Sequence, residues 1–387
     1  MAITDDKNNI ALYRKQRRSK RLRRRMLALF VVGLVGCTAY LTSPMWLKAF
    51  DGIALKVSSM AHQGDEGGFP IRLPDGELQL AAFGDSLAVL TDAHAYVYDA
   101  AGVQIKSVQH GFGHPVLQTG GRRLLLYDRG GYGLLMESRL TSTYKKTLDE
   151  PIVLARLSGK DYAAVVTQSG SYEPTMRILD SKGEQIFQWK SDYKIQDVAF
   201  DRDSAGCVVS TVSAQDGRIL TKLFHFRFNS VKEDWSAALQ GTLILSLHIR
   251  GDDTIAAVGD DRMALYSAKG EQLGSYVYPD VLVGYSHSDM LTALLFEDEG
   301  TRKVSIAAVG VPDDEDGVHT LSLDGRVTQV LADGDNVIVL AQGGITRFDE
   351  TLEQVAGIAP EYDYSKLVRV GGAYYALRVD GIDKLEE

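Results

Sequence analysis

The chain has 387 residues, 45% of them hydrophobic and 24% charged, and a formal net charge of −9. The charge is uneven: residues 1–25 carry a net +8 and the remainder a net −17. That balance excludes nucleic-acid binding by the main part of the chain, because such binding needs a positive surface. With only two cysteines, a disulfide framework is excluded as well.

A run of 22 residues without charge, residues 26–47, follows the basic residues Arg23, Arg24 and Arg25. As a helix it would span about 33 Å, enough to cross a hydrocarbon core of ~30 Å. The positive-inside rule places residues 1–25 in the cytoplasm, next to anionic lipid, and everything after the helix outside. Trp46 suits the outer interface. The sequence therefore predicts a single-pass membrane protein with a basic cytoplasmic tail.

A lipoprotein signal is the alternative for the same segment. The residues Leu34, Val35, Gly36 and Cys37 resemble a lipobox, in which case Cys37 would be lipidated and residues 1–36 removed. Against this, hydrophobic residues continue beyond Cys37. Both interpretations place the rest of the chain outside the cytoplasm, and the absence of an N-glycosylation sequon favours a bacterial envelope.

Residues 48–68 are predicted to be a linker because they end in a polar, glycine-rich stretch. From residue 69 to 387, short runs of Val, Ile, Leu and Tyr are separated by Gly and Asp turns, which predicts meandering strands. A strand–turn–strand pattern recurs about every 41 residues between Gly84 and Gly371. Its eight copies are residues 80–90, 116–127, 155–166, 199–210, 248–258, 284–295, 330–340 and 368–379.

A second hairpin pattern supports the same period. Its copies at residues 98–105, 179–186, 266–273 and 348–355 lie two repeats apart. A period near 40 with four strands per unit is typical of β-propeller blades. The last unit has room for three strands, and residues 69–73 can supply the fourth and close the ring. We therefore predict an all-β propeller of eight blades, with seven as the alternative because the fourth and sixth units are irregular.

These repeats resemble the quinoprotein-type and WD-type propellers. The whole layout resembles a family of single-pass, membrane-anchored propeller proteins of Gram-positive bacteria, which implies an envelope location and no particular activity. Quinoprotein blades carry a docking tryptophan after the turn glycine. Here only Trp189 follows such a turn, and the paired copies have Val108 and Tyr276 instead. We therefore predict no quinone and no other cofactor.

One pattern suggests an esterase. Gly84-Asp85-Ser86 resembles the nucleophile block of SGNH-type esterases, and Asp316 with His319 resembles the other half of their triad. Two observations oppose it. The helices and the further motif of that family are missing, and Gly84-Asp85-Ser86 occupies the same turn of its unit as residues 251–253 and 334–336 do in theirs. We predict no catalytic residue.

Two further patterns suggest metal sites. His110 and His114 are four apart, but in a stretch without helical character, and we expect a solvated pair. Residues 313–317 are acidic, but Pro312 breaks the pattern of a calcium loop, so we expect a solvated loop. No metal site is predicted.

Together these features predict a non-enzymatic binding or scaffold protein of the cell envelope, which presents propeller loops to another envelope protein. The alternative is a sensory or ligand-binding module for a cell-wall glycan or peptide, whose surface some of the 18 tyrosines would line. An SGNH-like esterase or a quinoprotein is the minor alternative.

Overall fold

The computed structural model describes residues 67–72, 76–139, 141–168, 173–314, 316–359 and 362–385. They belong to one compact unit, Asp65–Glu387. The predicted tail, membrane helix, linker up to residue 66 and lipid site at Cys37 lie outside the described residues. In the part of the chain that is described, no helix has the length and hydrophobicity to cross a membrane.

The described residues form 31 strands. The first sixteen are β1 (Glu77–Phe83), β2 (Ser86–Thr91), β3 (His94–Tyr98), β4 (Gln104–Gln109), β5 (Pro115–Thr119), β6 (Arg123–Asp128), β7 (Gly133–Ser138), β8 (Ser142–Thr147), β9 (Ile152–Leu157), β10 (Ala163–Gln168), β11 (Pro174–Leu179), β12 (Gln185–Lys190), β13 (Lys194–Phe200), β14 (Gly206–Gln215), β15 (Arg218–Arg227) and β16 (Glu233–Gln240). The others are β17 (Ile244–Ile249), β18 (Ile255–Gly259), β19 (Arg262–Tyr266), β20 (Gln272–Val277), β21 (Val281–His287), β22 (Thr292–Glu297), β23 (Val304–Val309), β24 (Val318–Leu323), β25 (Val327–Asp333), β26 (Asn336–Ala341), β27 (Gly344–Phe348), β28 (Gln354–Ile358), β29 (Lys366–Val370), β30 (Ala373–Arg378) and β31 (Gly381–Leu385).

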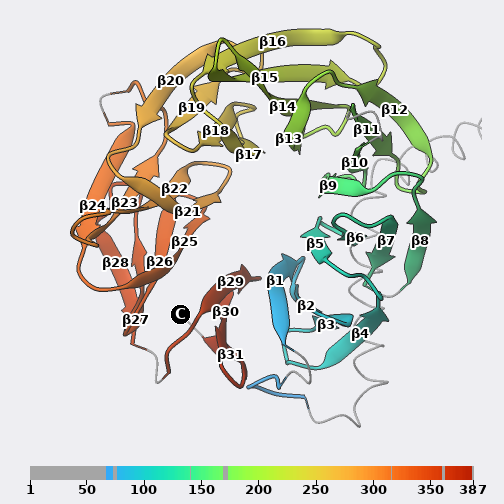
Figure 1. Ribbon diagram of the computed structural model, residues 1–387. Coiled ribbons are helices and arrows are strands. Elements are labelled where there is room, and N and C mark those ends of the chain that lie inside the picture. Colours follow the sequence, from blue (N-terminus) through green and yellow to red (C-terminus); the bar gives the residue numbers. More distant parts are fainter. Residues whose placement is uncertain are drawn as a thin grey trace, which may run out of the picture. The chain divides into compact units, whose positions relative to one another are not determined.

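These strands build eight antiparallel sheets in chain order, seven of four strands and a last one of three. The sheets stand around a ring, with the first strand of each nearest the middle and the fourth outside (Figure 1). We number them blades 1 to 8. The eight-bladed propeller is confirmed, and the seven-bladed alternative is wrong. All eight predicted hairpins join the first and second strands of a blade.

Blade packing explains the composition of the strands. The middle strands are covered on both faces by neighbouring blades, so they are continuous apolar runs: β2 is buried throughout its length. Outer strands such as β16 alternate between exposed and covered residues. Each hydrophobic cluster joins two adjacent blades, as Val258 of blade 5 joins Leu294 and Phe296 of blade 6. We call such a contact between adjacent blades a seam.

The ring closes through the segment that precedes β1. The backbone N–H and C=O of Ile71 both bond to Ile382 of β31, each at 2.9 Å. The ring of Phe69 packs edge-on against Tyr375 at 5.6 Å. Lys384 donates to the carbonyl of Ala100 in blade 1 at 3.0 Å. The described residues of this segment thus close the ring as expected, but through a single bridge, and the expected fourth strand of the last blade is not formed.

A bulge recurs in the first strands of six blades. In blades 1, 4 and 7 the residue after the bulge bonds to a neighbouring blade. In blades 1 and 7 the residue after the bulge is a glutamine that clamps the backbone of the next blade. Gln79 accepts from the N–H of Leu117 and donates to its carbonyl, at 3.2 and 2.8 Å. Gln329 does the same to Leu367, at 2.8 and 3.0 Å.

In blade 4 the residue after the bulge is Asp197, which joins three blades. Its carboxylate accepts from Arg156 of blade 3 at 2.8 Å and from the N–H of Leu247 of blade 5 at 2.9 Å. Only 1% of Asp197 is exposed. Such a buried carboxylate is stable only with partners of this kind, so it makes the position of each blade depend on the next.

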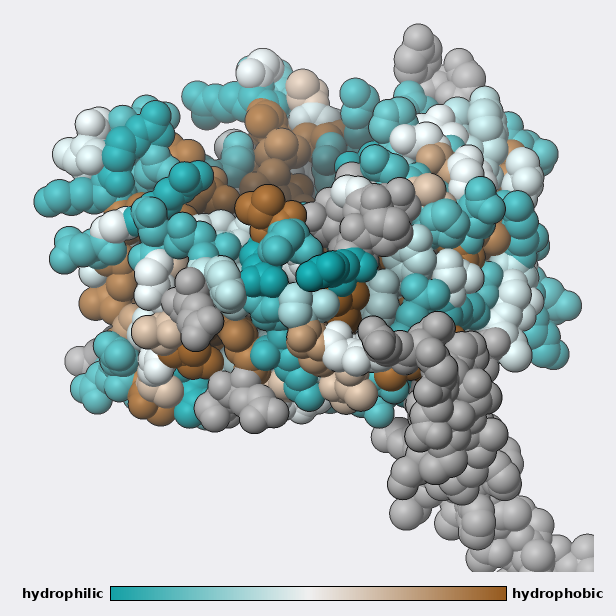
Figure 2. All heavy atoms as spheres, turned by 90° about the horizontal axis from the view of Figure 1, so that it is seen from below, coloured by the Kyte–Doolittle hydropathy of each residue, from teal (hydrophilic) through white to brown (hydrophobic). Residues whose placement is uncertain are grey.

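The strand order also decides which turns share a face. Because successive strands run in opposite directions, the first–second and third–fourth turns of every blade lie on one face of the ring, which we call the turn face. A cavity lined by Met290, Asp316 and Glu350, from three such turns, agrees with this. Seen from one edge, hydrophilic side chains cover most of the described surface, and hydrophobic ones gather in a recess (Figure 2).

Candidate functional site

The structure does not assemble the esterase suggested by the sequence. Ser86 is buried at the start of β2, where it pairs with Phe83 across the turn. Asp85 forms an ion pair with Arg139 of blade 2. His319 lies on β24 in blade 6, three blades away from Ser86 around the ring. The two halves of the suggested triad are therefore apart.

The three turns compared above share their place in the blade, as expected, but not their conformation. Gly84 and Gly334 each begin a two-residue turn with positive φ, 64° and 61°. In the Gly251 turn the residue with positive φ is Asp253, at 65°. Treating residues 251–253 as a version of the same turn was wrong, because the five-residue connection bends at its fourth residue.

The expected solvated histidine pair is wrong for His110. His110 is buried: its Nε2 lies 3.1 Å from the carbonyl of Thr91, and its Nδ1 accepts from the N–H of Phe112 at 3.1 Å. His114 is exposed. Because both ring nitrogens of His110 are engaged within the protein, the pair is not arranged to hold a metal.

The acidic loop and the tryptophan have structural contacts. Asp313 lies against Gly274 and accepts from the N–H of Ser275 at 3.3 Å, so it joins blades 5 and 6. Trp189 packs against Phe226 of blade 4, with ring centroids 4.8 Å apart. Within the described parts of the chain, no group of three or more His, Cys, Asp or Glu residues could hold a metal ion.

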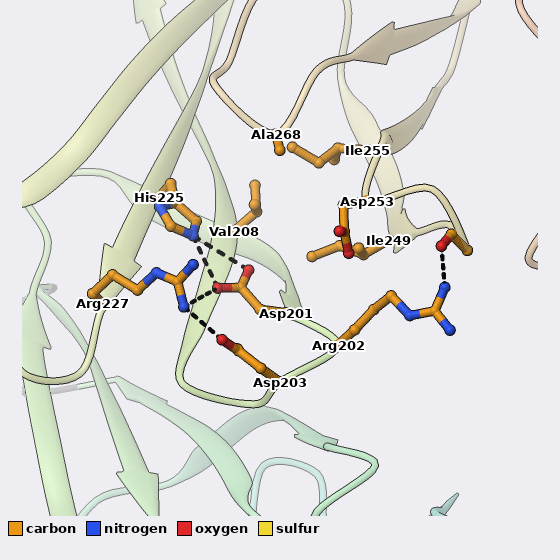
Figure 3. A pocket seen from close by; sticks show the side chains of 11 residues that line it. Asp201, Arg202, Asp203, Val208, His225, Arg227, Ile249, Asp253, Ile255 and Ala268 are labelled. Atoms are coloured by element: carbon orange, nitrogen blue, oxygen red, sulfur yellow. Dashed lines mark hydrogen bonds and ion pairs between the residues drawn. The ribbon is translucent and has the colours of Figure 1, made fainter.

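A cavity lined by charged residues lies in the seam between blades 4 and 5 (Figure 3). Its volume is about 330 Å³, and we call it the seam cleft. One wall comes from β15 and from the turn between β13 and β14. The other comes from the turn between β17 and β18. Its lining includes Asp201, Asp203, His225, Arg227, Asp253 and Ile255.

Two tight turns shape the mouth of the seam cleft. In the blade 4 turn, Ser204 has φ 54°, and the Asp203 side chain caps the turn by accepting from the N–H of Ala205 at 2.8 Å. In the blade 5 turn, Asp253 has positive φ and the Asp252 side chain accepts from the N–H of Thr254 at 3.0 Å. Short polar side chains tolerate this conformation, so Asp and Ser are suited to both turns.

His225 is held between two carboxylates on the blade 4 wall. Its Nε2 lies 3.1 Å from Oδ2 of Asp201, and its Nδ1 lies 3.1 Å from Oδ2 of Asp234. Its ring stacks on Trp235 with an interplanar angle of 9°. This arrangement fixes the imidazole on the blade 4 wall.

Arg227 lies beside Asp201 and Asp234 and neutralises part of the negative charge of these two carboxylates. Its guanidinium donates to Asp203 at 2.9 Å and lies 3.5 Å from Asp201 (Figure 3). The hydrogen bond to the backbone of Ala205 and the contact with Arg227 lower the pKa of Asp203. Asp203 is therefore ionised at neutral pH.

Trp235, on which His225 stacks, links blade 4 to blade 5 beside the cleft. Its Nε1 donates to the carbonyl of Ala268 in blade 5 at 3.0 Å, and its ring covers Gly270, where any side chain would collide with it. Tyr144 covers Gly183 in the next blade in the same way. Each aromatic residue belongs to the blade before its glycine, so the spacing from glycine to tryptophan within one repeat did not predict these contacts.

The residues that line the seam cleft are charged, imidazole or aliphatic. None of them is Ser, Thr, Cys, Lys or Tyr. The walls offer carboxylates and guanidinium groups, and the floor is aliphatic. Of the charged residues, only Asp253 was named from the sequence, and only as part of a turn. The others belong to β15 and to the turn between β13 and β14, and only the ring brings all of them together.

A second polar cluster, in the seam between blades 5 and 6, is closed. The rings of His248 and His287 stack 5.0 Å apart, and Arg250 donates to the carbonyls of Val309 and Gly310 at 2.8 and 2.7 Å. Burial, with the charge of Arg250 and His248 nearby, lowers the pKa of His287 to about 3. Burial also lowers the pKa of Arg250, to about 10. The histidines are therefore neutral.

Solved structures support the fold. The chain is similar to BamB from Moraxella catarrhalis (TM-score 0.56, 12% identity, 82% of this chain and 98% of that chain). It is similar to Saccharomyces cerevisiae Sqt1 (TM-score 0.58, 12% identity, 82% and 97%). It is also similar to apo AztD from Citrobacter koseri (TM-score 0.52, 12% identity, 73% and 86%). At these identities the likeness shows the propeller fold alone.

No curated protein sequence matches this chain. One family model does match it, over residues 73–355, which covers blades 1 to 6 and most of blade 7. The chain therefore belongs to the family of unknown function DUF5711.

Proposed function

We propose that this protein is a membrane-anchored, non-enzymatic scaffold of the bacterial cell envelope, which holds a partner protein on the turn face of its propeller. The observation that carries the proposal is the charge of that face over blades 6 and 7. The turns there carry seven exposed carboxylates and no Lys or Arg among their described residues: Asp289, Asp313, Asp314, Asp316, Asp335, Glu350 and Glu353.

These negative charges repel one another in the protein alone, and a basic partner would relieve that repulsion. They would also accelerate the approach of such a partner. The propeller holds these turns rigidly, because every blade is fixed by its seams. The fold fits a protein-interaction scaffold. The uncharged run at residues 26–47, after a basic tail, supports attachment to the membrane with the propeller outside.

The test is capture of the full-length protein from crosslinked, detergent-solubilised membranes, with its partners identified by mass spectrometry. We expect one stoichiometric envelope protein. The triple variant Asp335→Lys, Glu350→Lys, Glu353→Lys should reduce its recovery at least tenfold, because it reverses the charge of the turn face.

The matched control reverses three exposed carboxylates on the opposite face, Asp92→Lys, Asp149→Lys and Glu299→Lys, and should leave recovery unchanged. Recovery of the protein alone, or equal loss with both triple variants, would contradict the proposal. An activity of the purified protein on an envelope substrate would contradict its non-enzymatic part.

A further inference from the structure

The seam cleft has more negative than positive charge on its blade 4 wall. Three carboxylates, those of Asp201, Asp203 and Asp234, surround the single guanidinium of Arg227 at 3.5, 2.9 and 4.0 Å. Arg202, whose guanidinium donates to the carbonyl of Gly251 (Figure 3), is the second cation of this wall, and one carboxylate still remains in excess. A cation entering the cleft would meet this excess.

On the opposite wall, the carboxylate of Asp253 is available. It lines the cleft, and among the described residues its side chain has no hydrogen bond or ion pair. It lies across the cleft from Asp201 (Figure 3). The position is also exposed, so the carboxylate stays hydrated until a partner replaces the water.

Between these walls the cleft is aliphatic. Val208, Ile249 and Ile255 line it, and their methyl groups offer contact to a hydrocarbon chain but no hydrogen bond. The volume of about 330 Å³ is at the lower end of the range for small-ligand sites, ~300–1,000 Å³. An alkyl chain that ends in a cation matches such a lining, because its stem is buried while its head stays at the charged rim.

We propose that the seam cleft receives an arginine or lysine side chain of the partner protein. The inference rests on the proposed scaffold function and names the chemistry of one contact within it. The stem of the side chain lies against Val208, Ile249 and Ile255, and its cationic head lies between Asp201 and Asp253. The neighbouring acidic turns on the same face then meet further basic residues of the partner.

The probe is a pentapeptide, acetyl-Gly-Gly-Arg-Gly-Gly-amide, with lysine and citrulline versions. Citrulline has nearly the shape of arginine without its charge. The full-length protein in detergent is labelled at the isoleucine δ1 methyl groups and titrated by NMR. We expect the Arg and Lys peptides to shift the methyl signals of Ile249 and Ile255, while those of Ile338 and Ile345, in the seam between blades 7 and 8, stay in place.

Two variants test the charges. Asp253→Asn removes the available carboxylate in a residue that still tolerates positive φ, and it should weaken binding about fivefold or more. Asp203→Asn removes the carboxylate that pairs with Arg227, so the positive charge of Arg227 repels the cationic peptide more strongly and binding should also weaken. This second variant tests the inference even if Asp253→Asn does not fold. The control, Asp92→Asn, removes an exposed carboxylate from the opposite face of the ring and should leave the affinity unchanged.

Equal binding of the citrulline peptide, or no shift at Ile249 and Ile255 up to the solubility limit of the Arg peptide, would overturn the inference. Its failure can be told from failure of the scaffold function. A captured envelope partner without peptide binding would leave the scaffold in place and refute only the cleft contact.

Discussion

At the scale of single residues, buried and partly buried polar groups decide how the blades are placed. Asp197, His287 and the clamping glutamines each bond across a seam to a residue at least 38 positions away in the chain. A buried polar group without its partner costs about 1–3 kcal/mol, and more when it is charged. Correct placement of neighbouring blades is therefore required for each of these residues to be stable.

Replacing Asp197 should be among the most damaging single changes. Asp197→Ala leaves the guanidinium of Arg156 and the N–H of Leu247 without their acceptor, and we expect the free energy of unfolding to fall by about 3 kcal/mol. Denaturant unfolding of the full-length protein in detergent measures it. Asp335→Ala, at an exposed turn, should change it by less than about 0.5 kcal/mol. A loss below about 1 kcal/mol for Asp197→Ala would refute the role of this carboxylate.

The buried histidine pair predicts a loss of stability in mild acid. The pKa of His287 is about 3 in the folded chain and 6.5 when unfolded. Below pH 6.5 the unfolded chain therefore binds a proton that the folded chain does not, and the free energy of unfolding decreases as the pH falls toward 3. The slope from His287 is at most about 1.4 kcal/mol per pH unit.

Unfolding at several pH values between 7.5 and 5 measures this slope. His287→Gln should reduce it, because the titrating group is gone. His114→Gln, at an exposed histidine, should leave it as in the original protein. An unchanged slope in His287→Gln would show that other groups cause the acid sensitivity.

At the scale of elements, each blade is a local meander, and its two patterned turns mark it in the sequence. Blade 8 is the exception, because it has three strands and borrows its outer edge from residues before β1. Next to it, four of the five residues of β28 are exposed, and an apolar cavity of about 170 Å³ is lined by Ile338, Ile345 and Ile358. The short outer edge of blade 8 leaves this part of blade 7 partly uncovered.

The closing bridge should be sensitive to loss of one N–H group. Ile71→Pro removes the donor to Ile382, and we expect a loss of about 1–3 kcal/mol and faster proteolysis before β1. Arg72→Ala, at the next position, changes neither of the two bridge bonds and serves as control. Equal proteolysis of both variants would show that the bridge does not hold the ring closed.

At the scale of the whole molecule, the propeller is larger than the region that matches the family model. That region ends at residue 355, within β28, while strands continue to Leu385. Without β29–β31, the clamp of Gln329 and the seams on both sides of blade 8 have no partner. The ring depends on every blade, since each seam needs two.

A chain that ends at residue 355 should therefore fail to unfold cooperatively and should bind a hydrophobic dye. A chain that ends at residue 385 should behave as the full-length protein does. Calorimetry with dye binding compares the two. A cooperative transition in the shorter chain would mean that seven blades suffice.

The membrane topology predicted from the sequence has its own test at this scale. A cysteine at position 92 should react with a membrane-impermeant maleimide in intact cells, and a cysteine at position 7 should react only after lysis. The native Cys207 is fully buried and stays silent. The reverse pattern would contradict an extracytoplasmic propeller.

The sequence by itself determined the propeller fold and favoured eight blades over seven, with a ring closed by residues before the first blade. These predictions depend on hairpin turns rich in Gly and Asp, short apolar strands and a repeat near 41 residues. Each turn and strand is readable within a few residues of the chain. The predicted membrane helix also comes from the sequence alone and stays a prediction, since it lies outside the described residues.

Only the tertiary structure decided which polar residues meet. Asp201, His225 and Asp253 form the seam cleft although they lie up to 52 positions apart, and the stacked His248 and His287 come from different blades. The physical reason is that a propeller seam pairs residues about one repeat apart, on strand faces whose orientation depends on bulges and on the twist of each blade. No local sequence pattern predicts which residues meet in a seam. The polar clusters in the seams could therefore be identified only from the tertiary structure.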